Sequence, residues 1–254
     1  MAQWALVTGA TAGIGESFSR LLASQGFNVA LVARDEARLH ERAAGLREKY
    51  GVQTFVLPAD LSTNAGCRAV EDYISTYPIE VLVNNAGFGI NKAFSASQLD
   101  AEQQMFDVLV RTPMRLMHTI IPGMKERKSG IIINVSSVAS FIAGGTYSAS
   151  KSYLTVLSES LNTELASSGV KVSALCPGFT RTEFHQRGRM KMGGLPNFMW
   201  LNADKLVEQS WKDALANKPV SIPGWQYKLL VGVISTVPRK FVRQIGMNVR
   251  KKQR

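Results

Sequence analysis

The sequence has only two cysteines, Cys67 and Cys176, and they lie far apart in the 254-residue chain. This excludes a disulfide-dense secreted domain and favours free thiols in a reducing compartment. No apolar run approaches the ~20 residues of a membrane-spanning helix, and the N-terminus lacks the basic and apolar regions of a signal peptide. The three histidines show no metal-ligand spacing, so no metal site is expected. We therefore expect a cytoplasmic protein.

Acidic residues are absent after residue 224, where eight basic residues occur: Lys228, Arg239, Lys240, Arg243, Arg250, Lys251, Lys252 and Arg254. Removing these charges from the net +11 leaves +3 for residues 1–224, which we predict to form the main domain. In the tail, 225–254, apolar residues are interleaved with basic ones. This pattern fits an interfacial helix on anionic lipid, or a helix packed on its own domain or on a second subunit. The tail has little aromatic interleaving, so no nucleic-acid partner is expected.

Hydrophobic residues make up 45% of the chain, which excludes intrinsic disorder. Short apolar segments rich in β-branched residues predict strands at residues 4–8, 28–33, 53–58, 81–84, 130–135 and 171–176. Apolar residues recur with helical spacing at residues 14–25, 36–50, about 99–125, and 146–167, which predicts helices there. This alternation predicts a single α/β domain, with a doubly wound parallel sheet of Rossmann type in three α/β/α layers. Residues 180–200 break the rhythm and predict a long functional or mobile loop.

The first predicted strand runs into the glycine-rich segment Thr8-Gly9-Ala10-Thr11-Ala12-Gly13-Ile14-Gly15 and then into a helix. Glycines allow a tight turn and close approach of a ligand to the backbone. The helix N-terminus offers N–H groups and a positive dipole end to a pyrophosphate. The spacing, G-x-x-x-G-x-G, differs from the common G-x-G-x-x-G. A turn that serves packing alone is the alternative.

Further motifs follow in order, mostly at predicted strand ends: Asp60-Leu61, Asn84-Asn85-Ala86-Gly87, Ser136-Ser137, Tyr147-Ser148-Ala149-Ser150-Lys151 and Pro177-Gly178-Phe179-Thr180-Arg181-Thr182. Over roughly residues 1–185 the chain resembles the short-chain dehydrogenase/reductase family. The resemblance implies a nicotinamide cofactor, a carbonyl or alcohol substrate, and pairing through the two long helices as a homodimer or homotetramer. It implies that the cofactor is bound by Gly9, Thr11, Gly13, Ile14, Gly15, Arg34, Asp60, Leu61, Asn84, Ala86, Gly87, Tyr147, Lys151, Pro177, Gly178, Thr180 and Thr182.

Tyr147 and Lys151 are four residues apart, which places them on one face of a helix. A nearby ammonium favours the phenolate and is expected to lower the pKa of Tyr147, so that this residue can exchange a proton with a substrate oxygen. By resemblance, Ser137 polarises that oxygen and Lys151 also holds the nicotinamide ribose. Ser136 is the competing candidate, because adjacent strand residues point to opposite faces and only one of the two can face the site.

The choice of cofactor depends on the end of the second predicted strand. Enzymes that bind NAD usually carry an acid there for the ribose 2′-OH, and Ala33 occupies that place. Arg34 follows, and its planar guanidinium suits a 2′-phosphate. Asp35 is an argument against this, unless it serves as the N-cap of the next helix, which we prefer. We therefore expect NADP(H) rather than NAD(H).

Two features depart from the family pattern. Leu109 stands where the family usually has an asparagine that helps to hold a water linked to the lysine, and Ser137 and Tyr147 are only ten residues apart, about three fewer than usual. A member that binds NADPH but has little or no catalysis, as a sensor or partner module, is therefore the alternative to an enzyme. Met and Phe residues of the loop 180–200 favour an apolar substrate, and His185 could touch it.

Overall fold

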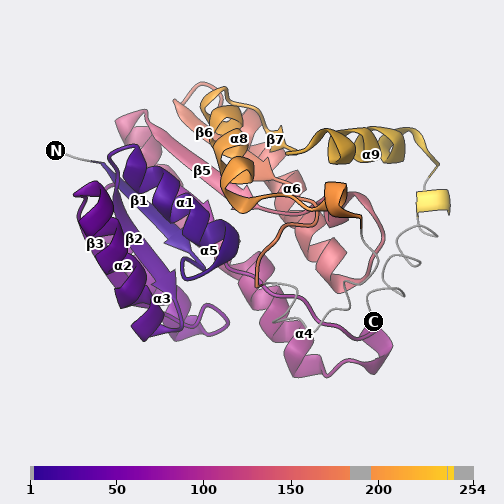
Figure 1. Cartoon of the computed structure of the whole chain (residues 1–254), viewed down its shortest axis with the longest axis horizontal. Coiled ribbons are helices and arrows are strands. Elements are labelled where there is room, and N and C mark those ends of the chain that lie inside the picture. Colours follow the sequence, from indigo (N-terminus) through magenta and orange to yellow (C-terminus); the bar gives the residue numbers. More distant parts are fainter. Residues whose placement is uncertain (1–2, 184–195, 239, 243–254) are drawn as a thin grey trace.

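The computed structural model describes residues 3–183, 196–238 and 240–242. Its centre is a parallel sheet of seven strands in the order β3-β2-β1-β4-β5-β6-β7 (Figure 1). The strands are β1 (Trp4–Thr8), β2 (Asn28–Ala33), β3 (Thr54–Pro58), β4 (Ile79–Asn84), β5 (Gly130–Val135), β6 (Val170–Leu175) and β7 (Val220–Ser221). The central strands are almost continuously buried, as expected for a parallel sheet covered on both faces.

Helices cover both faces of this sheet. On one side lie α1 (Gly13–Ser24), α2 (Glu36–Tyr50) and α8 (Ala203–Leu215), whose apolar residues share a core with one face of the strands. On the other side lie α3 (Asn64–Thr76), α5 (Thr112–Arg127) and α6 (Thr146–Glu164). The predicted three-layer, doubly wound α/β fold is confirmed.

The ends of α2 follow from local chemistry. The Asp35 carboxylate accepts a hydrogen bond from the Arg38 backbone N–H at 3.0 Å, which makes Asp35 the N-cap that we preferred. The helix ends at Gly51, whose φ of 67° is the left-handed conformation that glycine adopts at little cost. The carboxylate of Asp35 is thus engaged by its own helix.

The long helix predicted at 99–125 is interrupted. The structure has α4 (Leu99–Phe106), a π-helical turn η2 (Asp107–Arg111) and then α5. Short 3-10 turns occur at η1 (Phe94–Ala96), η3 (Val138–Phe141) and η4 (Asn197–Met199). Wide turns of the η2 kind are rare and are often found at functional sites.

The elements after residue 200 were not predicted. They are α8, the two-residue strand β7 and α9 (Trp225–Thr236), which lies within the predicted tail; helix α3 was not predicted either. Part of the predicted loop is visible as η4 and as a bridge between Thr180 and Leu201, whereas residues 184–195, with His185, lie outside the described residues. Within the described ranges, no helix has the length and apolarity needed to cross a bilayer.

Candidate active site

The motifs predicted from the sequence meet at the carboxyl ends of the strands. β1 lies between β2 and β4, so the chain winds outward in opposite directions from this point. In open parallel sheets, such a switch point is where ligands bind. The glycine-rich turn follows β1, Asn84-Asn85-Ala86-Gly87 closes β4, Ser136-Ser137 follows β5, and Pro177-Gly178 follows β6.

The three glycines of the glycine-rich turn stand at positions that have no room for a side chain. Gly9 and Gly13 have φ angles of 66° and 57°, in the region that favours glycine. A Cβ atom on Gly15 would lie 2.2 Å from the Gly9 carbonyl oxygen. The α1 N-terminus has Ala12 as its N-cap, with no side-chain hydrogen bond to its first turn. The result is a compact cradle with backbone N–H groups at its helical end, as a pyrophosphate requires.

The two asparagines that end β4 have different surroundings. Asn85 Nδ2 donates to the carbonyl oxygens of Thr8, at 2.8 Å, and Gly9, at 3.2 Å, so this residue holds the glycine-rich turn in place. Asn84, which the resemblance assigned to the cofactor, lies 3% exposed and donates to Asn134 Oδ1 at 2.9 Å. Asn85 thus positions the glycine-rich turn. In the sequence, the only sign of this role was the place of Asn85 in the motif.

The two serines after β5 also separate. Ser136 is buried, and its hydroxyl donates to the Lys151 carbonyl oxygen at 2.9 Å and shares a hydrogen bond with Thr155 at 2.7 Å. Ser137 shares a side-chain hydrogen bond with Tyr147. Ser137 therefore lies beside Tyr147, whereas the hydroxyl of Ser136 is used to anchor α6. The short segment between Ser137 and Tyr147 does not prevent their contact.

Tyr147 and Lys151 lie on the same face of α6, with Lys151 Nζ 5.7 Å from the centre of the Tyr147 ring. Nζ donates a 2.6 Å hydrogen bond to the Val135 carbonyl oxygen. The expected lowering of the Tyr147 pKa is not found. Burial raises the pKa of Tyr147 to about 12, against the opposing effect of the hydrogen bond with Ser137. Burial also lowers the pKa of Lys151 to about 8.

Leu109 lies in the π-helical turn η2, at the edge of this site, and is 1% exposed. A Cβ on Gly87 would lie 2.8 Å from Leu109 Cδ2 and 3.8 Å from Lys151 Nζ, so the leucine and the lysine both border this glycine. Together with Met105 and Val110 it forms an apolar cluster that packs against Tyr147. This cluster contributes to the desolvation of Tyr147.

At the end of β2, Arg34 is exposed. Burial of the Asp60 carboxyl raises its pKa, but hydrogen bonds from Ser62 and the positive charge of Arg34 together outweigh this and lower the pKa. The two residues after neighbouring strands are thus close enough to interact. Leu61 is buried in the core, and its carbonyl oxygen accepts a hydrogen bond from Thr112 at 2.8 Å.

The segment after β6 closes over the glycine-rich turn. The side chain of Thr182 packs closely against Gly13: a Cβ atom added to this glycine would lie only 2.9 Å from Thr182 Cβ. The next residue, Glu183, forms a bidentate ion pair with Arg38 of α2, at 2.8 and 3.2 Å. Sequence reasoning missed this pair, because its members are 145 residues apart. It fastens the start of the predicted substrate loop to the helix that follows Arg34.

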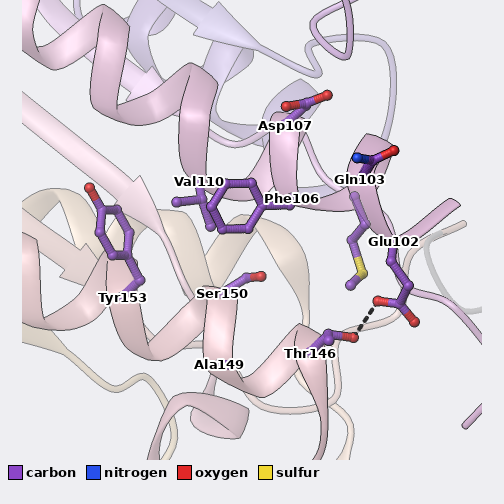
Figure 2. Close-up of a pocket in the computed structure, with 10 residues that line it drawn as sticks. Glu102, Gln103, Phe106, Asp107, Val110, Thr146, Ala149, Ser150 and Tyr153 are labelled. Carbon is purple, nitrogen blue, oxygen red and sulfur yellow. Dashed lines mark hydrogen bonds between the residues drawn. The ribbon is translucent and has the colours of Figure 1, made fainter. Parts of the chain in front are cut away.

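A hollow of about 650 Å³ lies on the outer side of α6, between this helix and α4–η2 (Figure 2). Phe106 and Tyr153 project into it, while Glu102 accepts a 2.6 Å hydrogen bond from Thr146 at its edge. Tyr147 and Lys151 do not line it. The hollow belongs to the surface formed by the two long helices rather than to the cluster of motif residues. Within the described residues, no group of three or more His, Cys, Asp or Glu could hold a metal ion.

Comparison with known proteins agrees with this arrangement. The short chain dehydrogenase family profile matches residues 3–192. A very-long-chain 3-oxoacyl-CoA reductase of Laccaria bicolor is 38% identical over 181 residues, covering 68% of this chain and 53% of the relative. Inactive hydroxysteroid dehydrogenase-like protein 1 of Homo sapiens is 33% identical over 187 residues, covering 71% of this chain and 56% of the relative.

A solved structure, a short-chain dehydrogenase from Sphingobium yanoikuyae in complex with NADPH, has a TM-score of 0.84 at 31% identity and covers 93% of this chain and 96% of that chain. The chain spans little more than half the length of the two curated relatives. The match to the family profile extends over most of the chain and includes the glycine-rich turn, Ser137, Tyr147 and Lys151. The chain belongs to the short chain dehydrogenase family.

Proposed function

We propose that the protein is an NADP(H)-dependent oxidoreductase that transfers a hydride between the nicotinamide and a carbonyl or alcohol carbon. The observation that carries the proposal is the hydrogen-bonded pair Ser137–Tyr147, with Lys151 on the same helical face, at the sheet edge that holds the glycine-rich cradle. A hydroxyl donor, a polarising hydroxyl and a buried cation are the groups that carbonyl reduction needs.

The residues around the cradle fit a dinucleotide. Gly9, Gly13 and Gly15 leave the space that a pyrophosphate needs against the α1 N-terminus, and Thr182 lies over it. The remaining residues assigned to the cofactor surround the same edge of the sheet: Thr11, Ile14, Asp60, Leu61, Asn84, Ala86, Gly87, Pro177, Gly178 and Thr180. When bound, the cofactor supplies the hydride.

The chain's own groups manage the proton. Tyr147 is protonated at neutral pH, as a tyrosine with its ordinary pKa already is, and burial raises this pKa further. Its hydroxyl donates to the substrate oxygen as the carbonyl is reduced. Ser137 orients the same oxygen through a hydrogen bond. Lys151, with a pKa lowered to about 8, is still mostly an ammonium at neutral pH and stabilises the developing phenolate.

Two features of the β2 end support NADP(H). Arg34 is exposed where a 2′-phosphate would lie, and the carboxylate of Asp35 is occupied as the α2 N-cap. An arginine guanidinium donates two parallel hydrogen bonds to a phosphate. The NADPH in the similar Sphingobium yanoikuyae structure agrees with this choice.

We propose an apolar carbonyl or alcohol as the substrate class. The Met and Phe residues at positions 180–200 support it, as does the similarity to a very-long-chain 3-oxoacyl-CoA reductase. The similarity to a dehydrogenase-like protein named inactive, together with Leu109, supports the alternative of a protein that binds NADPH without efficient catalysis.

The test follows NADPH oxidation with a panel of aliphatic, acyl and ring ketones, with NADH in parallel. We expect turnover with NADPH, loss of turnover in Tyr147→Phe with NADPH binding retained, and little change in Tyr153→Phe, which lies on the outer side of the same helix. Turnover in Tyr147→Phe would refute its role. NADPH binding with no turnover in the wild-type protein would favour the alternative, and Leu109→Asn would then be the variant to assay for gained activity.

A further inference from the structure

Helix α9 exposes an apolar stripe to solvent. Trp225, Leu229 and Val233 recur every four residues and are 72%, 62% and 52% exposed. Leu230, beside them, is 40% exposed. Residues four apart lie on one side of a helix, so these side chains form one continuous surface. We refer to Trp225, Leu229, Leu230 and Val233 as the α9 stripe.

The opposite face of α9 is firmly packed. Tyr227, Val231 and Ile234 are buried, and the Tyr227 hydroxyl donates to the Met199 carbonyl oxygen at 2.6 Å and accepts from the Phe179 backbone N–H at 3.0 Å. The Tyr227 ring also fills the space where a Cβ on Gly178 would be. The orientation of α9, which lies at the periphery of the molecule (Figure 1), is therefore fixed, and the exposure of its stripe is a property of the fold.

The charge of this region has a single sign. Lys228 of α9 and Lys240 after it are exposed, and the sequence from Trp225 to Arg254 holds eight basic residues and no acidic ones. Apart from this segment the chain carries a net charge of only +3. The segment of the sequence that holds this apolar stripe thus accounts for most of the net positive charge of the chain, eight of eleven.

We propose that α9 docks on the surface of a membrane that contains anionic lipid, with the stripe in the interface and the lysines at the headgroups. A helix with an apolar face and flanking basic residues gains both from burying apolar area and from the negative surface potential. A second copy of the chain fits less well, because it would bring two strongly basic segments together. Each partner of a stable dimer also contributes roughly 20–30 residues, far more than the stripe provides.

The position of α9 connects this surface to the candidate active site. Tyr227 holds Phe179 and Gly178, which belong to the segment after β6 that closes over the cradle, and α9 lies against η3, directly after Ser137. A docked α9 would therefore present this side of the site to the bilayer. The docking itself requires only the surface of α9 and not the proposed activity.

The first experiment is flotation of the full chain with vesicles of phosphatidylcholine alone or mixed with phosphatidylglycerol. We expect binding to the mixed vesicles that weakens as salt is raised, and little binding to phosphatidylcholine. The stripe variant Leu229→Gln/Val233→Gln should lose roughly tenfold or more in partitioning, because two apolar side chains no longer enter the interface. Leu99→Gln, which changes an equally exposed leucine on α4, should bind like the wild type.

A second variant tests the charges without altering the stripe. Lys228→Gln/Lys240→Gln should lose roughly fivefold for each lysine on anionic vesicles, whereas Lys212→Gln, an exposed lysine on α8, should not. The proposal would be overturned if the wild type bound equally to vesicles with and without phosphatidylglycerol, or if the stripe variant floated as well as the wild type. A stripe variant that halves the mass by light scattering without vesicles would overturn it as well, since the stripe would then bind a second copy.

Discussion

Lys151 is an unusual residue energetically, because it is 4% exposed and its ammonium has no carboxylate partner among the described residues. Its pKa falls from 10.5 to about 8, and desolvation is the cause. One pKa unit corresponds to ~1.4 kcal/mol, so holding this charge inside destabilises the folded chain by roughly 3 kcal/mol at neutral pH. The lysine that the proposed chemistry needs should therefore reduce stability.

The sign of the pH dependence follows from the direction of the shift. Below pH 8 both the folded and the unfolded chain hold the proton, and the full destabilisation is present. Between pH 8 and 10.5 the folded chain has lost a proton that the unfolded chain still holds, so this residue makes stability rise with pH. Integrated from pH 7 to pH 10, the wild type should gain about 2.5 kcal/mol from Lys151 alone.

The perturbation is Lys151→Met, which keeps an unbranched chain and removes the charge. The variant also loses the hydrogen bond to the Val135 carbonyl oxygen, so its stability at one pH is ambiguous. The difference between wild type and variant, measured at both pH values, removes that constant contribution. We expect the unfolding free energy of the wild type to rise relative to the variant by about 2.5 kcal/mol between pH 7 and pH 10.

The assay is urea unfolding of the cofactor-free proteins, followed by circular dichroism. Lys212→Met, which removes an exposed lysine from α8, is the matched control and should keep a constant difference from the wild type. A wild-type-minus-Lys151→Met difference that stays constant, or that falls as the pH rises, would refute the reasoning that burial governs Lys151.

Three further predictions concern the cradle, the cofactor and the assembly. Gly15→Ala should abolish NADPH binding, measured by fluorescence titration, because its Cβ would lie 2.2 Å from the Gly9 carbonyl oxygen, whereas Gly45→Ala, with open space around it in α2, should raise stability by ~0.5–1 kcal/mol. Equal NADPH binding by the two variants would contradict the assigned cradle. Arg34→Glu should raise the KM for NADPH at least ~tenfold and leave that for NADH nearly unchanged, since only NADPH loses a charged hydrogen bond; parallel losses would exclude selection by Arg34. Phe106→Asp should convert the expected homo-oligomer to monomers by light scattering, because Phe106 is 54% exposed in the hollow between the long helices; an unchanged mass would remove this surface from the interface.

Much of the arrangement was predictable because it depends on short-range spacing. Tyr147 and Lys151 are four residues apart on a helix, and the glycine-rich turn follows a strand, so both placements follow from local geometry. The sequence left the choice between Ser136 and Ser137 open, with Ser137 preferred. Packing of β5 against α6 favours Ser137, because the Ser136 hydroxyl is bonded to the backbone of α6.

Of the parts that were missed, some depend on contacts between distant residues. β7 has two residues, too few for an apolar pattern, and pairs with β6 from across a long intervening segment. The ion pair of Arg38 with Glu183 has no local signal. The π-helical turn η2 lies inside a segment of continuous helical spacing, so nothing in its periodicity indicated an interruption. The division of the chain into a main domain, 1–224, and a tail, 225–254, stays a prediction.

The predicted direction of the pKa shift of Tyr147 was wrong for the same reason. A four-residue spacing places a cation near a phenol, and from this alone a lowered pKa follows. The spacing does not reveal that Leu109, Met105 and Val110 pack against the same group, and in the folded chain desolvation dominates its pKa. Leu109 therefore matters in two ways: it cannot hydrogen-bond a water as an asparagine would, and it helps to dry the site. Desolvation favours the protonated phenol, so in the mechanism that we propose the developing phenolate would depend more on the ammonium of Lys151.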